Sequence, residues 1–326
     1  MRIVRADDLD RLLTFPALVE TLRSAFRGGF TAPTRHHHHV GSHEGPGAIH
    51  LLMPAWSAGA PAAGAYVGTK IVDVFPDNGR LGLPAVMGVY VLQSGETGAP
   101  LAVLDGTRLT HWRTAAVSAL GADILARPEA SRLLVVGAGA LAPFLARAHA
   151  SVRPPSHVAV WNHRPAGAER LAESLRASGL PAVAVTDLEA AVRAADTVAC
   201  ATLSTVPLVE GAWLRPGQHI DLVGAFTMAM READDEALRR ARVAVDTPAS
   251  LSEGGDVAIA IRDGVLQPSD ILDLGSLCRG EVRGRLGPHD ITLFKPVGTA
   301  VADLATAILA WEAVPRAETP DGAEGG

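Results

Sequence analysis

Short apolar runs alternate with amphipathic stretches through the second half of the chain. The runs that are short enough for buried strands span 132–136, 157–161, 182–185, 197–201, 219–223, 242–245 and 291–294. The stretches with helical spacing of apolar residues span 141–152, 166–178, 187–195, 232–241 and 300–314. Strands and helices that alternate at this spacing are typical of a parallel sheet with helices on both faces. The pattern therefore predicts an α/β fold with a doubly wound parallel sheet.

The first half of the chain has a different pattern. Strand-like apolar runs are separated by turn residues, and they span 49–53, 66–74, 85–93 and 101–104. One helix is predicted between Thr14 and Gly28, with Pro16 in its first turn. Another helix, over 110–127, carries small residues on much of its surface. We therefore expect a second domain that is built on a sheet and has few helices.

A glycine-rich turn joins the strand at 132–136 to the helix at 141–152. Gly137 permits a tight turn, and Gly139 has no Cβ, so a pyrophosphate can approach the backbone there. The start of the helix then offers unpaired N–H groups and a partial positive charge to the phosphates. This context predicts a dinucleotide site, and the alternative is a glycine turn that binds nothing.

Composition excludes several classes of protein. Of the 326 residues, 48% are hydrophobic, which supports a large core and excludes a disordered chain. The net charge of −6 without a basic block argues against a nucleic-acid partner. Cys200 and Cys278 lie in apolar surroundings and have no metal-ligand spacing, as in a reducing cytoplasm. No uncharged apolar run approaches the ~20 residues of a membrane helix. We therefore expect a cytoplasmic protein that binds no membrane.

The strand at 157–161 is followed by Asn162, His163 and Arg164. In a dinucleotide-binding fold, an acidic residue at this point binds the ribose 2′-hydroxyl and repels a 2′-phosphate. No carboxylate stands here, whereas Asn162 can donate to a phosphate and Arg164 can pair with it. We therefore expect NADPH to be preferred over NADH. The alternative is that Asn162 and Arg164 only cap the next helix.

Four consecutive histidines, His36 to His39, invite a metal interpretation. On an extended chain their side chains alternate and cannot all face one ion. We therefore favour a polar loop beside Arg35 and predict no metal site. His50 and His111 could each donate a proton, but a hydrogen-bonded structural role is the preferred interpretation for both.

A series of segments runs through nearly the whole chain in the order found in one known family. They span 70–78, 98–106, 109–116, 137–142, 200–204, 211–217, 223–225 and 292–295. On these segments the chain resembles the ornithine cyclodeaminase/mu-crystallin family. The resemblance implies a homodimer whose subunit has two domains. A Rossmann-type domain covers 116–298, and an α+β substrate-binding and dimerisation domain covers 1–115 plus 299–326.

The resemblance also implies the site residues. The family places three cations around the substrate's α-carboxylate, and the matching residues are Arg35, Lys70 and Arg113, of which Lys70 and Arg113 are expected to be catalytic. A guanidinium fixes a carboxylate in position and angle, and a lysine adds a point charge. The implied cofactor ligands are Arg113, Gly137, Gly139, Ala140, Leu141, Asn162, His163, Arg164, Thr202, Leu203, Ser204, Val223 and Gly224.

Two positions depart from the cyclodeaminases of the family. Phe226 stands where they carry an aspartate, and Leu51-Leu52 precedes Met53-Pro54 where they carry a glutamate. A phenyl ring cannot accept a proton, and a diamine substrate would leave an ammonium group poorly paired. We therefore expect a reductase of a small cyclic imino acid, Δ1-pyrroline-2-carboxylate to proline or Δ1-piperideine-2-carboxylate to pipecolate. Three alternatives remain: a lyase with bound NAD, an amino-acid or opine-type dehydrogenase, and an NADPH carrier.

Overall fold

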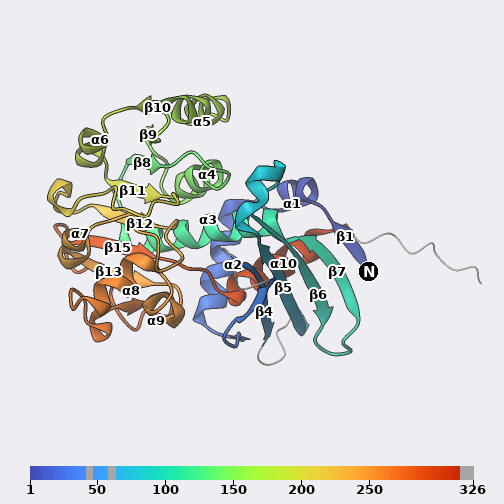
Figure 1. Cartoon of the computed structure of the whole chain (residues 1–326). Coiled ribbons are helices and arrows are strands. Elements are labelled where there is room, and N and C mark those ends of the chain that lie inside the picture. Colours follow the sequence, from blue (N-terminus) through green and yellow to red (C-terminus); the bar gives the residue numbers. More distant parts are fainter. Residues whose placement is uncertain (42–46, 58–63, 316–326) are drawn as a thin grey trace, which may run out of the picture.

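The computed structural model describes residues 1–41, 47–57 and 64–315, in which two β-sheets flank a set of long helices (Figure 1). The first sheet has the strand order β1-β7-β6-β5-β4-β2, and β3 pairs with β4. It is antiparallel apart from β1, which runs parallel to β7. Its strands are β1 (Arg2–Val4), β2 (Phe30–Thr31), β3 (His36–Val40), β4 (Ala48–Ser57), β5 (Tyr66–Val74), β6 (Val86–Ser94) and β7 (Pro100–Asp105).

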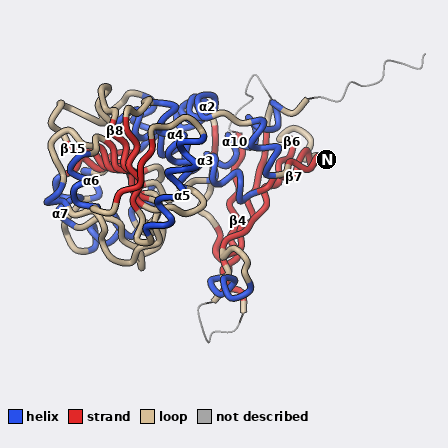
Figure 2. Tube along the Cα trace, turned by 90° about the horizontal axis from the view of Figure 1, so that it is seen from above, coloured by secondary structure: helices blue, strands red, loops and turns tan. Residues whose placement is uncertain are grey.

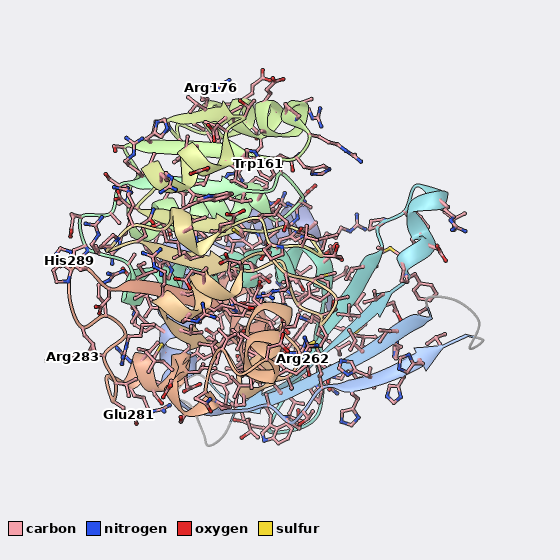
Figure 3. The ribbon with its side chains drawn as sticks, turned by 60° about the vertical axis from the view of Figure 1, so that its left-hand side comes forward. Trp161, Arg176, Arg262, Glu281, Arg283 and His289 are labelled. Atoms are coloured by element: carbon pink, nitrogen blue, oxygen red, sulfur yellow. The ribbon has the colours of Figure 1, made fainter. Side chains whose placement is uncertain are left out.

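The second sheet is parallel throughout and has the order β10-β9-β8-β11-β12-β15-β13-β14. Its strands are β8 (Arg132–Val136), β9 (His157–Trp161), β10 (Ala182–Val185), β11 (Thr197–Cys200), β12 (His219–Leu222), β13 (Ala241–Val245), β14 (Leu272–Asp273) and β15 (Ile291–Lys295). Figure 3 shows Trp161 on the side where the strands end and His289, which precedes β15, on the opposite side.

Helices cover both faces of the second sheet, because the side chains of its strands alternate between two cores. Leu133 and Val135 of β8 pack with α4 and α5, while Leu134 and Val136 pack with α6, α7 and α8. These helices, with α9, are α4 (Ala142–Val152), α5 (Pro165–Ala177), α6 (Leu188–Ala194), α7 (Asp235–Arg240), α8 (Gly255–Arg262) and α9 (Leu274–Arg279). The predicted doubly wound α/β fold is therefore confirmed.

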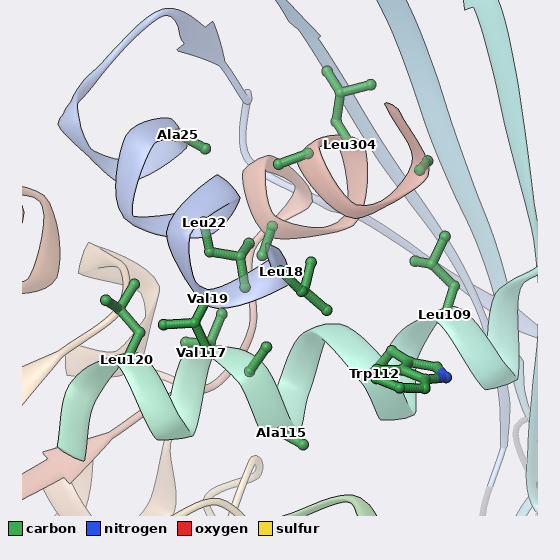
Figure 4. Close-up of a cluster of buried hydrophobic side chains, with 14 of the residues drawn as sticks. Leu18, Val19, Leu22, Ala25, Leu109, Trp112, Ala115, Val117, Leu120 and Leu304 are labelled. Atoms are coloured by element: carbon green, nitrogen blue, oxygen red, sulfur yellow. The ribbon is translucent and has the colours of Figure 1, made fainter. Parts of the chain in front are cut away.

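The first sheet is covered by a layer of four helices. These are α1 (Ala6–Leu12), α2 (Phe15–Arg27), α3 (Gly106–Leu125) and α10 (Ala300–Ala313). Helices α1, α3 and α10 contact the strands of the sheet, and α2 packs on α3 and α10. Leu18 and Leu22 of α2 meet Leu109 of α3 and Leu304 of α10 in one buried cluster (Figure 4). Because α10 returns to β4 and β5, residues near the C-terminus reach the inner face of this sheet.

Helix α3 connects the two sheets, and α4 packs against it between them (Figure 2). Helix α3 contacts β5, β6 and β7 of the first sheet and β12 and β15 of the second. Its small residues permit this close packing, since a Cβ on Gly121 would collide with the ring of Phe294. The expected domain boundary between 115 and 116 falls inside α3, and residues 316–326 lie outside the described part of the chain. The domain limits therefore stay a prediction.

The histidine run is not a loop, so that expectation was wrong. His36–Val40 forms β3, which pairs along its whole length with β4, and the pairing satisfies backbone groups that a loop would leave to water. His38 lies opposite His50, whose Nδ1 is 2.8 Å from Asp73 Oδ1. No group of three or more metal-ligating side chains that could hold an ion occurs among the described residues.

Other elements had no clear apolar signal. The short strands β1, β2 and β14 and the helices α1, α8 and α9 were not predicted. Residues Gly255 to Ala260 of α8 are all buried, so this helix has no polar face to reveal its period. Helix α7 begins at Asp235 rather than at residue 232, because Ala233 bridges to Val209 and Asp234 caps the helix. Asp234 and Asp235 therefore serve the helix start.

Candidate functional site

Apart from Arg113, which lies on α3, the predicted cofactor ligands gather along one edge of the second sheet. Strands β9, β8, β11 and β12 are neighbours and run parallel, so the residues that follow them lie at the same edge. These residues include Asn162 after β9, Gly137 after β8, Thr202 after β11 and Val223 after β12. The chain winds in opposite directions from β8 and β11, and such a switch point is where open α/β sheets bind ligands.

The turn after β8 has the form that a pyrophosphate requires. Gly137 adopts a φ of +108°, and a Cβ there would lie 2.6 Å from the carbonyl oxygen of Ala201. A Cβ on Gly139 would meet nothing within 4 Å, so the space above it is open. The backbone N–H groups of Gly139, Ala140 and Leu141 donate to no group in the described part of the chain. The residues present therefore fit the phosphates of a dinucleotide.

The segment after β9 combines a local side-chain contact with exposed cationic groups. Asn162 Nδ2 donates to the carbonyl oxygen of Arg164 at 3.0 Å, and a Cβ on Gly167 would lie 2.6 Å from that nitrogen. Asn162 is therefore held by a local contact, but it does not cap the helix, because no described side chain accepts from the first N–H groups of α5. The side chains of His163 and Arg164 are exposed, and neither forms an ion pair with any described residue. Both remain available to a ligand.

The loops after β11 and β12 are tied together by a residue that sequence reasoning did not assign. Glu232 Oε1 accepts from the backbone N–H and the hydroxyl of Thr202 at 2.7 and 2.8 Å. Its Oε2 accepts from the backbone N–H of Gly224 at 2.7 Å. Leu203, which follows Thr202 in the loop after β11, is exposed. The Ser204 hydroxyl donates to the carbonyl oxygen of Val206. The only sequence signal for Glu232 is its position, since it is an acidic residue soon after the largely apolar stretch that begins at Phe226.

Two of the three predicted substrate cations share one buried carboxylate. Lys70 Nζ lies 2.7 Å from Asp303 Oδ2, and Arg113 Nε donates to Asp303 Oδ1 at 2.9 Å. Lys70 is 2% exposed, Arg113 7% and Asp303 0%. Lys70 lies in a row with Met53, Tyr90 and Leu104 on the inner face of the first sheet. Asp303 was not predicted, because its neighbours on α10 are apolar and nothing nearby in sequence marks it.

The charges of this cluster shift the pKa values of its members. Burial and the charges of Arg113 and Arg35 lower the pKa of Lys70 to about 8, although Asp303 opposes the shift. Burial would raise the pKa of Asp303, but Lys70 and Arg113 outweigh burial and hold that pKa below its usual value. Burial also raises the pKa of Tyr90, which lies opposite Lys70 on β6. The cluster is therefore closely packed, charged and shielded from water.

Arg35 reaches the same place from the segment before β3. Its Nη2 donates to the carbonyl oxygen of Gly298 at 2.9 Å and lies 3.4 Å from Glu253 Oε2. Gly298 also faces Arg113, because a Cβ on it would lie 2.5 Å from Arg113 Nη1. Its φ of +87° suits glycine, and Asp246 accepts its N–H at 2.8 Å. The turn before α10 thus brings Arg35 and Arg113 together.

Other predicted groups lie apart from this cluster. His50 pairs with Asp73, and His111 stacks on Phe144 with a ring-centroid distance of 5.3 Å. Burial and the charge of Arg108 lower the pKa of His111. Cys200 and Cys278 are both buried thiols, as expected. A hollow of about 440 Å³ between β10 and α6 contains none of the predicted site residues.

Known proteins resemble this chain over most of its length. The pattern that defines the ornithine cyclodeaminase/mu-crystallin family matches residues 6–318. Delta(1)-pyrroline-2-carboxylate reductase of Paracoccus denitrificans is 42% identical over 243 residues, which cover 74% of this chain and 77% of that protein. The structure of the Thermococcus litoralis Delta(1)-pyrroline-2-carboxylate reductase in complex with NADH and L-proline has a TM-score of 0.89 at 32% identity, covering 96% of this chain and 97% of that one.

A second solved structure shows how widely the fold is used. An archaeal alanine dehydrogenase dimer with bound NAD has a TM-score of 0.87 at 29% identity, covering 96% of this chain and 95% of that one.

None of the helices within the described residues has the length and apolar character that crossing a bilayer demands. On the family pattern and the similarity of the relatives, the chain belongs to the ornithine cyclodeaminase/mu-crystallin family.

Proposed function

We propose that this chain is a nicotinamide-dependent reductase of cyclic imine 2-carboxylates, Δ1-pyrroline-2-carboxylate to proline and Δ1-piperideine-2-carboxylate to pipecolate. The observation that carries the proposal is the shared carboxylate of Asp303. It is a single carboxylate between two buried cations, so Lys70, Arg113 and Asp303 together carry a net positive charge. The other acids nearby are engaged elsewhere, because Glu253 faces Arg35 and Asp246 accepts from the turn at Gly298. Such a cluster favours a small substrate with a carboxylate. Relatives at 42% and 32% identity carry the name of this reductase.

The proposed roles follow from what each side chain touches. Arg113 and Lys70 hold the α-carboxylate of the substrate, and Arg35, which also contacts Gly298, binds it beside them. A bound nicotinamide supplies the hydride that reduces the C=N bond. The imine nitrogen takes up one proton as the carbon takes up the hydride. The pKa of Lys70, about 8, keeps its ammonium group charged at neutral pH.

The same site disfavours a cyclodeaminase reaction. Phe226 follows β12 with its side chain 42% exposed, and Leu51 lies on β4, so neither position offers a carboxylate for a second amino group. A diamine would place an ammonium group beside three cations without a free anionic partner, which is costly. The similarity to an alanine dehydrogenase favours one second candidate, an amino-acid dehydrogenase that reduces an open-chain imine.

We infer that NADPH is preferred over NADH and that the protein acts in the cytoplasm. No carboxylate follows β9, while His163 and Arg164 are exposed and unpaired among the described residues. A 2′-phosphate there gains a charge-assisted hydrogen bond that a 2′-hydroxyl does not. The structure of the Thermococcus litoralis relative contains NADH, so the size of the preference in this protein has to be measured. The deciding quantity is the ratio of the Michaelis constants for the two cofactors.

We also infer a homodimer formed through the outer face of the first sheet. Side chains alternate along β5 and β6, so the row next to Lys70 points away from α10. The apolar side chains of that outer face are Leu52, Ile71, Met87, Val89 and Val91, and the polar pair His50 and Asp73 lies beside them. Met87 and Val89 are 38% and 42% exposed in the single chain. A contiguous apolar sheet face of this kind is typical of a subunit interface.

One assay tests the reductase proposal directly. Purified protein is mixed with NADPH and each of four additions: Δ1-pyrroline-2-carboxylate, Δ1-piperideine-2-carboxylate, pyruvate with ammonia, and ornithine. Loss of NADPH absorbance with a cyclic imine alone supports the proposal. Loss that requires a keto acid and an amine supports the amino-acid dehydrogenase instead. Ammonia release from ornithine without loss of NADPH would overturn the reductase proposal in favour of the lyase.

A further inference from the structure

Glu232 is a fully buried acid that joins two loops at the ligand-binding edge of the second sheet. Its two oxygens accept from Thr202 on one side and from Gly224 and Ala225 on the other, with Ala225 N at 3.3 Å. The loops also touch directly, since a Cβ on Gly224 would collide with the carbonyl oxygen of Thr202 and lie 2.5 Å from Glu232 Oε1. Every group that hydrogen-bonds to this carboxylate donates to it. The donors of both loops are therefore paired only when both oxygens can accept, as in the ionised form.

A second set of contacts fixes Glu232 itself. Asp256 of α8 accepts from the backbone N–H groups of Glu232 and Ala233 at 2.8 and 3.0 Å. Lys295 of β15 lies 3.3 Å from Asp256 and donates to the carbonyl oxygen of Leu222 at 2.7 Å. Asp256, Glu232 and Lys295 are all 0% exposed. The joint is therefore braced from β12, β15 and α8, although none of these residues needs to touch a ligand.

The two loops it joins lie at the edge of the second sheet where we expect the cofactor to bind. They follow β11 and β12, which lie next to the phosphate turn of β8 in the sheet. Thr202 and Gly224 are also among the cofactor residues that the family resemblance implies. This step rests on the proposed function, because it takes a nicotinamide cofactor as the ligand of that edge.

The ionisation of Glu232 depends on its buried surroundings. Burial raises its pKa to about 7, the charge of Lys295 opposes the rise, and that of Asp256 adds to it. Cys200 of β11 also faces it, and burial holds the pKa of that thiol well above its usual value. Arg231 beside it pairs with Asp235 at 2.7 Å. Protonation would turn one acceptor oxygen into a hydroxyl and leave a loop N–H without its partner.

We propose that Glu232 is a positioning residue for the cofactor: its ionised carboxylate holds the loops after β11 and β12 in the spacing that receives the nicotinamide ring. Loss of that charge, by protonation or substitution, loosens the spacing and weakens cofactor binding. The substrate cations Arg35, Lys70 and Arg113 make no contact with Glu232, so the effect falls on the cofactor rather than on the carboxylate.

The test is direct binding of NADH, followed by the fluorescence of the bound cofactor at pH 6 and pH 8. NADH is used because it lacks the 2′-phosphate, which itself titrates in this range. The wild type should bind more weakly at pH 6 than at pH 8. In Glu232→Gln one side-chain oxygen can still hold Thr202, but the amide NH₂ meets the N–H of Gly224. Its Kd should therefore be at least about tenfold higher than that of the wild type at pH 8 and equal at the two pH values.

A matched control is Asp221→Asn. Asp221 is also a fully buried acid of this sheet, it contacts Ser118 and His149, and it touches neither loop. The control should lose stability yet keep the wild-type Kd and its pH dependence. A Glu232→Gln protein that binds NADH like the wild type at pH 8, or a wild type whose Kd is the same at both pH values, overturns the inference while the reductase proposal stands. A wild type that binds neither NADH nor NADPH overturns both.

Discussion

Lys70 on β5 and Asp303 on α10 form an ion pair of 2.7 Å in which neither side chain reaches solvent to any extent. One comes from the N-terminal half of the chain and the other from its last described helix, so the pair closes the first sheet onto α10. The same carboxylate orients Arg113 through Nε and leaves the two terminal nitrogens of that guanidinium toward Gly298. This arrangement links the stability of the fold to the proposed substrate site.

Removing the charge of Asp303 should destabilise the protein. Asp303→Asn keeps the shape of the side chain but leaves two buried cations without their counter-charge. The free energy of unfolding, measured in urea, should fall by about 3 kcal/mol or more. The control is Asp263→Asn, which breaks the exposed pair with Arg262 and should change nothing measurable. Equal stability of Asp303→Asn and the wild type would show that the buried cluster does not support the fold.

Arg113 should be essential to turnover. Arg113→Ala removes a charge-assisted contact from a desolvated site, so kcat/KM for the cyclic imine should fall at least ~100-fold. Arg113→Lys keeps the charge but not the planar fork, and should fall between the alanine variant and the wild type. Steady-state kinetics at saturating NADPH measure both. An Arg113→Ala protein with the wild-type rate would remove Arg113 from the proposed site.

Affinity for a carboxylate ligand should decline above pH 8. Because burial lowers the pKa of Lys70 to about 8, this side chain is charged at pH 7 and largely neutral at pH 9. Pyrrole-2-carboxylate, a planar anion with no group that titrates in this range, should bind about tenfold more weakly at pH 9 than at pH 7. Lys70→Arg stays charged and should lose this dependence. Calorimetry that finds the same decline in both proteins would assign it to another group.

Arg164 should distinguish the two cofactors. Arg164→Ala removes the cation available to a 2′-phosphate, so KM for NADPH should rise about tenfold while KM for NADH changes less than about twofold. Arg170→Ala, an exposed arginine of the helix that follows, is the matched control and should change neither. If both KM values respond equally to Arg164→Ala, the residue does not read the 2′-phosphate and the NADPH preference loses its support.

The outer face of the first sheet should control assembly. Val89→Asp places a charge among the apolar side chains of this face, and light scattering should report a monomer where the wild type is a dimer. Val183→Asp is the control, since Val183 is 41% exposed on β10 and Val89 is 42% exposed on β6. A Val89→Asp protein that remains dimeric would move the interface to another surface.

The sequence alone was sufficient for elements whose side chains follow a clear period. Strands at 132–136, 157–161 and 182–185 match β8, β9 and β10 residue for residue, because each is an apolar run bounded by turn residues. The runs of β8 and β9 are largely buried, whereas β10 is a partly exposed strand at the end of the sheet. The histidine strand β3 carries no apolar signal, and its structure comes from pairing with β4. Helix α8 is buried all round, so its period is hidden.

The candidate site divides in the same way. Gly137 was predicted from the local strand, turn and helix pattern, and Lys70 from a segment that resembles the family. Asp303 and Glu232 are acids that act across the fold, on residues from other strands and helices. Their partners are brought together by tertiary packing. Local sequence patterns do not reveal which distant groups a buried acid will contact.

The central claim is that Arg35, Lys70 and Arg113 hold the carboxylate of a small imino acid against a nicotinamide ring. A crystal structure of the protein with oxidised cofactor and L-proline tests this most directly. The account predicts the proline carboxylate within hydrogen-bond distance, about 2.7–3.2 Å, of Arg113 and Lys70, with its α-carbon facing the nicotinamide ring. A carboxylate bound away from all three cations, or a proline distant from the ring, would contradict it.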